Sequence, residues 1–286
     1  MNLPCKTAAV SALVFLGVTF ALAADTHKQT FNIAPSGTMN VINSAGSVVL
    51  RPAIGRQASV SYTAFSDKVE ADCSSTPDGR RVEVRTHALA GQKPTPEESR
   101  VDFEIAVPAG VSVNISTSTA SITIENLSGD FSLSSDTGQI TVNGVTNSFV
   151  HVHSLTAPVT LNNLSGVHAE IMSTSGAVQM TSVTGPKVNV STTGGDISYT
   201  GNFSGGGTYS LITHNGAISV SLPETASVDL SARSISGSVE NDFPLRDKSH
   251  TTFIPTPGRS FAGTSHTGSS WVELQSFSGR IRVKKQ

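Results

Sequence analysis

Two histidines separated by one residue are the local arrangement in this chain with the clearest chemical potential. His151 and His153 alternate with Val150 and Val152, so on a β-strand both imidazoles would project from the polar face. Glu170 occupies the position equivalent to His151 one repeat later. Two imidazoles and a carboxylate could hold a divalent metal ion. A pair of solvated histidines is the simpler interpretation, since no further His or Cys aligns with them; we expect no metal and no other cofactor.

Acidic side chains raise a second possibility, the cleavage of acidic polysaccharides, which requires carboxylates grouped on neighbouring strands. The acidic residues of the repeats are Asp130, Asp136, Glu170, Asp196 and Asp229. They occupy different positions in the repeating unit and do not align. The chain also has no P-loop, no nucleophile-elbow motif and no zinc-protease motif. We therefore expect no catalytic residues, and a polysaccharide-active enzyme is kept as an alternative.

These residues belong to an internal repeat in which apolar side chains follow a small residue by two and four positions. The small residues are Gly46, Ala120, Gly138, Ala157, Gly176, Gly195, Gly216, Gly237 and Gly279. From Ala120 onward the steps are 18, 19, 19, 19, 21, 21 and 42 residues. The last step predicts two units, one of them hidden in the loop-like stretch 244–268.

A second apolar pair precedes each small residue by seven and five positions, and a spacing of two is the periodicity of a β-strand. Each unit is therefore two short strands joined at the small residue, and stacked units bury a continuous apolar column. The prediction is an all-β parallel solenoid (β-helix) over residues 110–286, with roughly 19 residues per turn. Ile140 should point inward and Thr141 outward. A β-sandwich is the rival fold, but its loops vary in length, whereas four consecutive units keep their register.

Residues 24–109 are less regular and are predicted to form an N-terminal β cap. Residues 1–23 contain an apolar run ending in a small-x-small site, which predicts a cleaved secretory signal and an exported protein. No other stretch is expected to span a membrane. Cleavage would remove Cys5 and leave Cys73, interpreted as a small buried apolar residue, with pairing between chains as the alternative.

Composition excludes several partners. The formal net charge is -2 and charged residues make up 14% of the chain, so a basic surface for nucleic acid is not expected. Outward Thr123, Thr141 and Thr160 share one column, which ends at Gln179 and indicates ordinary strand propensity. The cationic tail, residues 280–286, is predicted to protect an exposed final strand edge from pairing, with contact to an anionic surface as the alternative.

The unit S/T-x-x-G-x-I/V-x-V, as in residues 135–142 and 276–283, resembles a bacterial family of putative adhesins. The resemblance implies a right-handed β-solenoid that is secreted or surface-exposed, with no established catalytic residues. The expected function is a non-enzymatic, adhesin-like binding module of the periplasm, cell surface or exterior, which binds through the repetitive Ser/Thr/Asn-rich surface of the solenoid. Its expected ligand is a glycan or an envelope protein. A structural component without a ligand is a further alternative.

Overall fold

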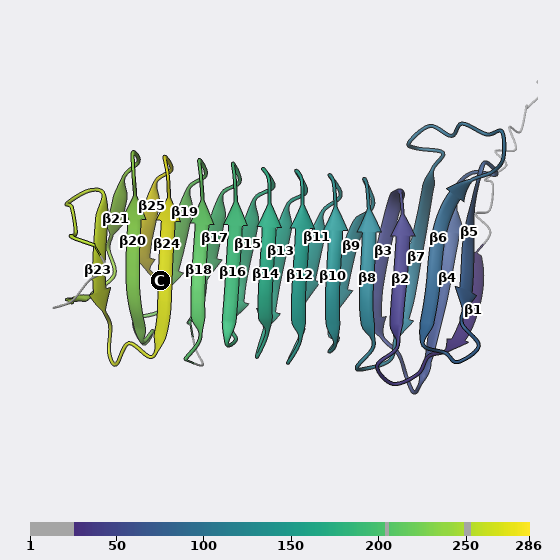
Figure 1. Ribbon diagram of the computed structural model, residues 1–286, viewed down its shortest axis with the longest axis horizontal. Coiled ribbons are helices and arrows are strands. Elements are labelled where there is room, and N and C mark those ends of the chain that lie inside the picture. Colours follow the sequence, from purple (N-terminus) through teal and green to yellow (C-terminus); the bar gives the residue numbers. More distant parts are fainter. Residues whose placement is uncertain (1–25, 204–205, 249–252) are drawn as a thin grey trace, which may run out of the picture.

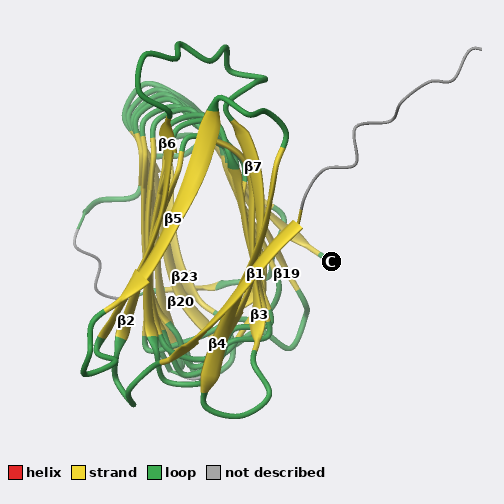
Figure 2. Ribbon diagram, turned by 90° about the vertical axis from the view of Figure 1, so that its right-hand side faces the viewer, coloured by secondary structure: helices red, strands yellow, loops and turns green. Residues whose placement is uncertain are grey.

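The computed structural model describes residues 26–203, 206–248 and 253–286, and every regular element in these ranges is a β-strand. The predicted signal segment, residues 1–23, lies outside the described residues. The strands form two sheets that face each other across an apolar core (Figures 1 and 2).

The two sheets are named here by their number of strands. In spatial order the twelve-stranded sheet contains β1 (Thr26–Asn32), β4 (Gln57–Ala64), β7 (Arg100–Val107), β3 (Ala45–Pro52), β9 (Ser121–Glu125), β11 (Ile140–Asn143), β13 (Val159–Leu164), β15 (Val178–Val183), β17 (Ile197–Thr200), β19 (Ile218–Leu222), β25 (Ile281–Lys285) and β21 (Val239–Asn241). The thirteen-stranded sheet contains β22 (Arg246–Asp247), β23 (Ser260–Thr264), β20 (Val228–Ser234), β24 (Ser270–Ser276), β18 (Thr208–Thr213), β16 (Lys187–Thr192), β14 (His168–Ser173), β12 (Phe149–Ser154), β10 (Asp130–Ser135), β8 (Ser112–Thr117), β2 (Thr38–Asn43), β6 (Arg81–Ala88) and β5 (Val69–Ser75).

From β8 to β19 the chain changes sheet after every strand, and each strand from β10 onward pairs in parallel with the strand two elements earlier. Ile140 of β11 is in register with Ile122 of β9 and Val159 of β13, and all three side chains are buried. Thr141 and Thr123 pair in the same way on the outer side. The predicted inward and outward sides of these strands are therefore confirmed, and the fold is all-β, with two long, mostly parallel sheets.

The small residues that join the two strands of each turn lie in one line, as predicted. Register places Gly138 beside Ala120 and Gly195 beside Gly176. A Cβ atom built on Gly195 would lie 2.2 Å from the carbonyl oxygen of Gly176, and one on Gly138 would lie 2.0 Å from that of Ala120. The turns therefore pack their backbones against each other at this corner, which explains why only the smallest residues occur there.

A column of buried hydroxyls runs beside this line, three residues before each small residue. Its members include Thr117, Ser135, Ser154, Ser173, Thr192, Thr213, Ser276 and Ser234. Ser154 Oγ donates to the carbonyl oxygen of Ala157 at 2.6 Å, and Ser135 Oγ donates to that of Gly138 at 2.7 Å. A buried carbonyl group without a hydrogen-bond partner is costly, so these hydroxyls stabilise the corner by donating to its backbone carbonyl groups. The Ser/Thr of the sequence unit thus has a structural role that the sequence pattern alone did not indicate.

The opposite corner, at the end of the strands of the twelve-stranded sheet, uses left-handed backbone. Asn126, Asn163 and Ser182 have φ values of 53°, 55° and 54°. Asn tolerates this conformation better than most residues, and Ser adopts it here in the equivalent turn. The repeated Asn in these turns is therefore explained by backbone geometry.

At the C-terminal end the spatial order departs from the chain order (Figure 1). The last strands, β24 and β25, lie between β18/β19 and β20/β21. A Cβ on Gly279 would meet the Gly216 carbonyl oxygen at 1.8 Å, and one on Gly237 would meet that of Gly279 at 2.2 Å. The expectation of a unit hidden in residues 244–268 is therefore wrong. That stretch contains β22 and β23, which pair antiparallel, and β23 continues the sheet beyond β20.

The N-terminal end is interleaved in the same manner. β2 and β3 lie between β8/β9 and β6/β7, although β6 and β7 come later in the chain than β2 and β3. Beyond them, β1 and β4 continue one sheet and β5 the other through antiparallel pairs. The N-terminal region therefore contributes two pairs of strands to the stack as well as antiparallel strands at its end.

The cationic tail does not protect a final edge, which corrects the sequence-based interpretation. β25 pairs with β19 on one side and with β21 on the other. Arg280 forms an ion pair with Glu240, and Arg282 contacts Asp242 at 3.3 Å. The tail residues therefore join neighbouring strands within the sheet.

Candidate functional site

The histidine pair lies on the outer face of the thirteen-stranded sheet, in β12. His151 is in register with Glu170 of β14, and its Nδ1 lies 3.7 Å from Glu170 Oε2. His153 is instead in register with Met172. Within residues 26–203, 206–248 and 253–286 there is no group of three or more His, Cys, Asp or Glu side chains arranged to hold a metal ion. The structure brings His151 and Glu170 together but adds no third ligand of these types.

The acidic residues singled out from the sequence are spread over the molecule. The expectation that none of them align is wrong for Asp130 and Asp229, which occupy the same column of the thirteen-stranded sheet. The strands β12, β14, β16, β18 and β24 nevertheless lie between them. Asp229 forms an ion pair with Lys248, and Asp196 Oδ1 accepts a hydrogen bond from the Ala217 amide at 2.7 Å. Asp196 therefore stabilises a turn between neighbouring units.

Outward residues of the twelve-stranded sheet are polar or charged along most of its length. Thr123, Thr141 and Thr160 form the predicted column, and Gln179 follows Thr160 in register. None of the large, exposed apolar side chains of the described residues lies on a strand of this sheet.

The strands of the thirteen-stranded sheet, unlike those of the twelve-stranded sheet, carry large, exposed apolar side chains. Five of the eleven large, exposed apolar side chains of the described residues lie on its strands: Ile42, Phe149, Met172, Ile212 and Trp271. Leu155, Ile235 and Phe277 directly follow its strands, whereas Phe65 directly follows β4 of the twelve-stranded sheet. Trp271 is 44% exposed and Phe277 is 45% exposed. The large, exposed apolar side chains of the described residues are therefore distributed unevenly between the two sheets.

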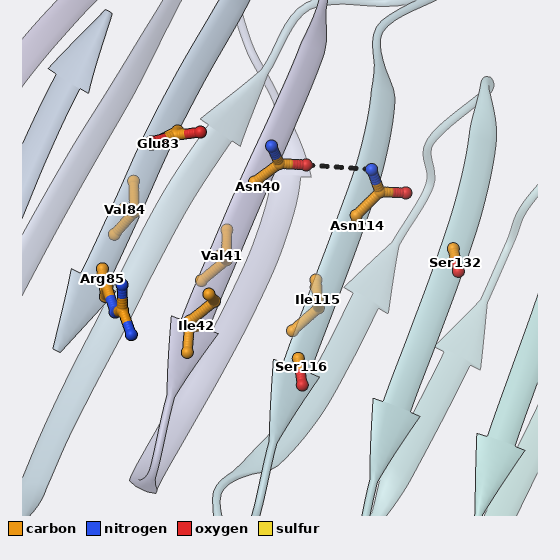
Figure 3. Close-up of a pocket in the computed structure, with 10 residues that line it drawn as sticks. All are labelled: Asn40, Val41, Ile42, Glu83, Val84, Arg85, Asn114, Ile115, Ser116 and Ser132. Atoms are coloured by element: carbon orange, nitrogen blue, oxygen red, sulfur yellow. Dashed lines mark hydrogen bonds between the residues drawn. The ribbon is translucent and has the colours of Figure 1, made fainter.

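A hollow of about 390 Å³ lies on this face near the N-terminal end, over β6, β2, β8 and β10 (Figure 3). Asn114 Nδ2 donates to Asn40 Oδ1 at 2.9 Å, which leaves the Asn40 amide hydrogens and the Asn114 carbonyl oxygen for a ligand. Ile42 and Arg85 lie beside them. Glu83 also lines the hollow and contacts Arg81 at 3.6 Å. The hollow therefore combines amide, hydroxyl, apolar and cationic groups with the carboxylate of Glu83.

A second hollow, of about 330 Å³, lies at the C-terminal end of the same sheet. His214 and Phe277 stack at its margin with ring centroids 4.7 Å apart. Ile212, Ile235 and Arg233 complete its apolar and cationic lining. Both hollows contain an arginine, a side-chain amide, hydroxyl groups and isoleucine side chains, although no sequence motif linked them.

Cys73 lies on β5, at the edge of the thirteen-stranded sheet, and is half-buried. Burial is the main cause that raises the pKa of its thiol to about 11, and the charge of Asp72 adds to this. A thiol with such a pKa stays protonated at neutral pH and is a poor nucleophile.

No helix within the described residues is long and apolar enough to cross a membrane. The family model Toastrack DUF4097 matches residues 38–284. The chain belongs to the Toastrack DUF4097 family. This confirms the family resemblance noted from the sequence.

Solved structures similar to this Toastrack chain have low sequence identity to it. A putative adhesin from Bacteroides fragilis is 11% identical, with a TM-score of 0.48, and covers 92% of this chain and 97% of its own. A putative adhesin from Parabacteroides merdae is 10% identical, with a TM-score of 0.35 and the same coverage. A putative cell adhesion protein from Clostridium sporogenes is 12% identical, with a TM-score of 0.30, and covers 92% of this chain and all of its own. No curated protein matches the chain.

Proposed function

We propose that this chain is a non-enzymatic, exported binding module of the adhesin type, and that its ligand lies on the outer face of the thirteen-stranded sheet. The observation that carries the proposal is the concentration of large, exposed apolar side chains on that face. The predicted signal segment, residues 1–23, supports export. The partner is a surface glycan or an envelope protein.

The rigidity of the stack supports this use. Central strands pair on both edges, and the interior is filled with buried Val, Ile and Leu side chains. A wall of this kind presents repeated groups at fixed spacing, so that several weak contacts act together. We further propose that the coil is right-handed with about 19 residues per turn, as the repeat spacing and family resemblance indicate.

The test compares two double variants with matched changes on opposite faces. Met172→Glu with Ile212→Glu places two carboxylates on the thirteen-stranded sheet, and Thr160→Glu with Ser198→Glu places two on the twelve-stranded sheet. All four positions point outward, so both proteins should keep the wild-type circular dichroism spectrum and unfolding midpoint.

Binding is then measured on a glycan array and on whole bacterial cells. The first variant should lose affinity at least about tenfold, because its carboxylates must be desolvated against the ligand. The second variant should bind as the wild type does. Equal loss in both variants, or loss only in the second, would place the ligand elsewhere. An absence of binding by the wild type in both assays would favour a component without a ligand.

A further inference from the structure

One outward column of the thirteen-stranded sheet runs the length of the stack and joins the two hollows. We call it the outer track. From the N-terminal to the C-terminal end it contains Arg85, Ile42, Ser116, Ser134, His153, Met172, Ser191, Ile212, Gln275 and Arg233. Ten neighbouring strands contribute one residue each, and nine strand spacings give a length of about 43 Å.

From β6 to β20 the outer track contains no carboxylate and has an arginine at each end, and Asp72 of β5 continues the column beyond Arg85. Arg85 and Arg233 are exposed, and within the described residues neither has an ion-pair partner within 4 Å. The acidic groups nearest in register are already engaged. Asp72 faces Arg85 across β5 and β6 but contacts His87 at 3.3 Å. Glu83, which lines the same hollow as Arg85, contacts Arg81 at 3.6 Å. Glu273, which lies in a hollow beside Arg233, accepts a hydrogen bond from Gln275. The two guanidinium groups are therefore available to an anionic ligand.

The kind of ligand follows from what the face offers. Every strand that contributes to the outer track is paired on both edges, so an extended peptide cannot add to the sheet there. Contacts must come from side chains, and the track and its neighbours present hydroxyls, amides and small apolar surfaces such as Ile42 and Ile212. This set matches a sugar polymer, whose rings combine hydroxyl groups with C–H faces.

We propose that the outer track binds an elongated, carboxylate-bearing polysaccharide, with Arg85 and Arg233 each receiving a carboxylate in the hollow at its end. The inference rests on the proposed function, because it assigns a ligand class to the same face. Simultaneous contact at both hollows makes affinity depend on chain length. Short acidic oligosaccharides reach one hollow only, and long ones reach both.

The experiment measures binding by isothermal titration calorimetry with four probes. These are short oligogalacturonate, long oligogalacturonate, the carboxyl-reduced form of the long oligomer, and polyglutamate. The proteins are wild type, Arg85→Gln, Arg233→Gln, the double variant, and Arg56→Gln as a control. Arg56 is exposed in the turn between β3 and β4 of the twelve-stranded sheet.

Wild-type protein should bind the long acidic oligomer most tightly and lose affinity as salt rises. Each single variant should weaken that binding about tenfold, since it removes one charge-assisted contact. The double variant should bind the long acidic oligomer no better than the carboxyl-reduced form, and Arg56→Gln should change nothing.

Two results would overturn the inference while leaving the proposed function intact. The first is equal binding of acidic and carboxyl-reduced oligomers, which would make the ligand a neutral glycan. The second is tighter binding of polyglutamate than of long oligogalacturonate, which would make it an acidic protein segment. If the four probes do not bind, the carboxylated-sugar assignment is also wrong, and the face variants above then decide the proposed function by themselves.

Discussion

Replacing Ile140 by aspartate should unfold the protein. Ile140 has no exposed surface and stands in the ladder between Ile122 and Val159. An ionised carboxylate there would have no partner and no water, which costs about 4 kcal/mol or more. Because total stability of a domain is commonly about 5–15 kcal/mol, we expect loss of the cooperative thermal transition or a large fall in the urea midpoint.

Thr141→Asp is the matched control, since Thr141 is the next residue and points outward. Its free energy of unfolding should differ from that of the wild type by no more than about 0.5 kcal/mol, the usual range for surface substitutions. Equal damage from the two substitutions would contradict the assignment of inner and outer faces.

The second large effect is expected at the corner where the turns touch. Gly195→Val should destabilise the protein by at least about 2 kcal/mol, because a β-branched side chain would overlap the backbone of the neighbouring turn. Ala120 and Ala157 occupy the same column, so the corner admits a single Cβ atom with a small shift. A branched side chain needs more space than this corner provides.

Gly194 supplies the control one residue away. A Cβ at Gly194 would have its nearest neighbours at 3.8 Å, an ordinary van der Waals distance. Chemical denaturation of Gly194→Val should therefore show a much smaller loss than Gly195→Val. If the two variants unfold at the same denaturant concentration, the close approach of the turns is not what selects small residues.

The central part of the fold was predictable because the pattern that defines each strand lies within a short stretch of sequence. A small residue with apolar positions at fixed offsets defines both strands and their inner faces, and regular steps from Ala120 to Gly195 imply stacking in chain order. The same reasoning placed Ile140 inside and Thr141 outside. Most of the strands can therefore be assigned from apolar residues that recur at every second position.

The ends were not predictable in this way. Nothing in the pattern around Gly237 and Gly279 indicates which unit lies next to Gly216, because all have the same form. The order is set by long-range packing, in which β24 and β25 separate β18/β19 from β20/β21. The charges of Arg280 and Arg282 acquire their partners only through that order.

The candidate binding face was also only partly predictable. The sequence singled out His151, His153 and Glu170, which lie on the thirteen-stranded sheet but form one contact between two of them. Arg85 and Arg233 are far apart in the chain. They lie on β6 and β20, near the two ends of the sheet, where the spatial order of the strands differs from their order in the chain. Their shared column emerges only when the spatial order of the strands is known.

Hydroxyl-radical footprinting of the protein with and without its bound surface ligand tests the location of the binding face most directly. Bound ligand should lower oxidation of Met172, Trp271 and Phe277, which are exposed on the thirteen-stranded sheet and at its corner. Buried Met180 of β15 serves as an internal reference that should not change. Bound ligand that leaves oxidation of all three exposed side chains unchanged would contradict the account.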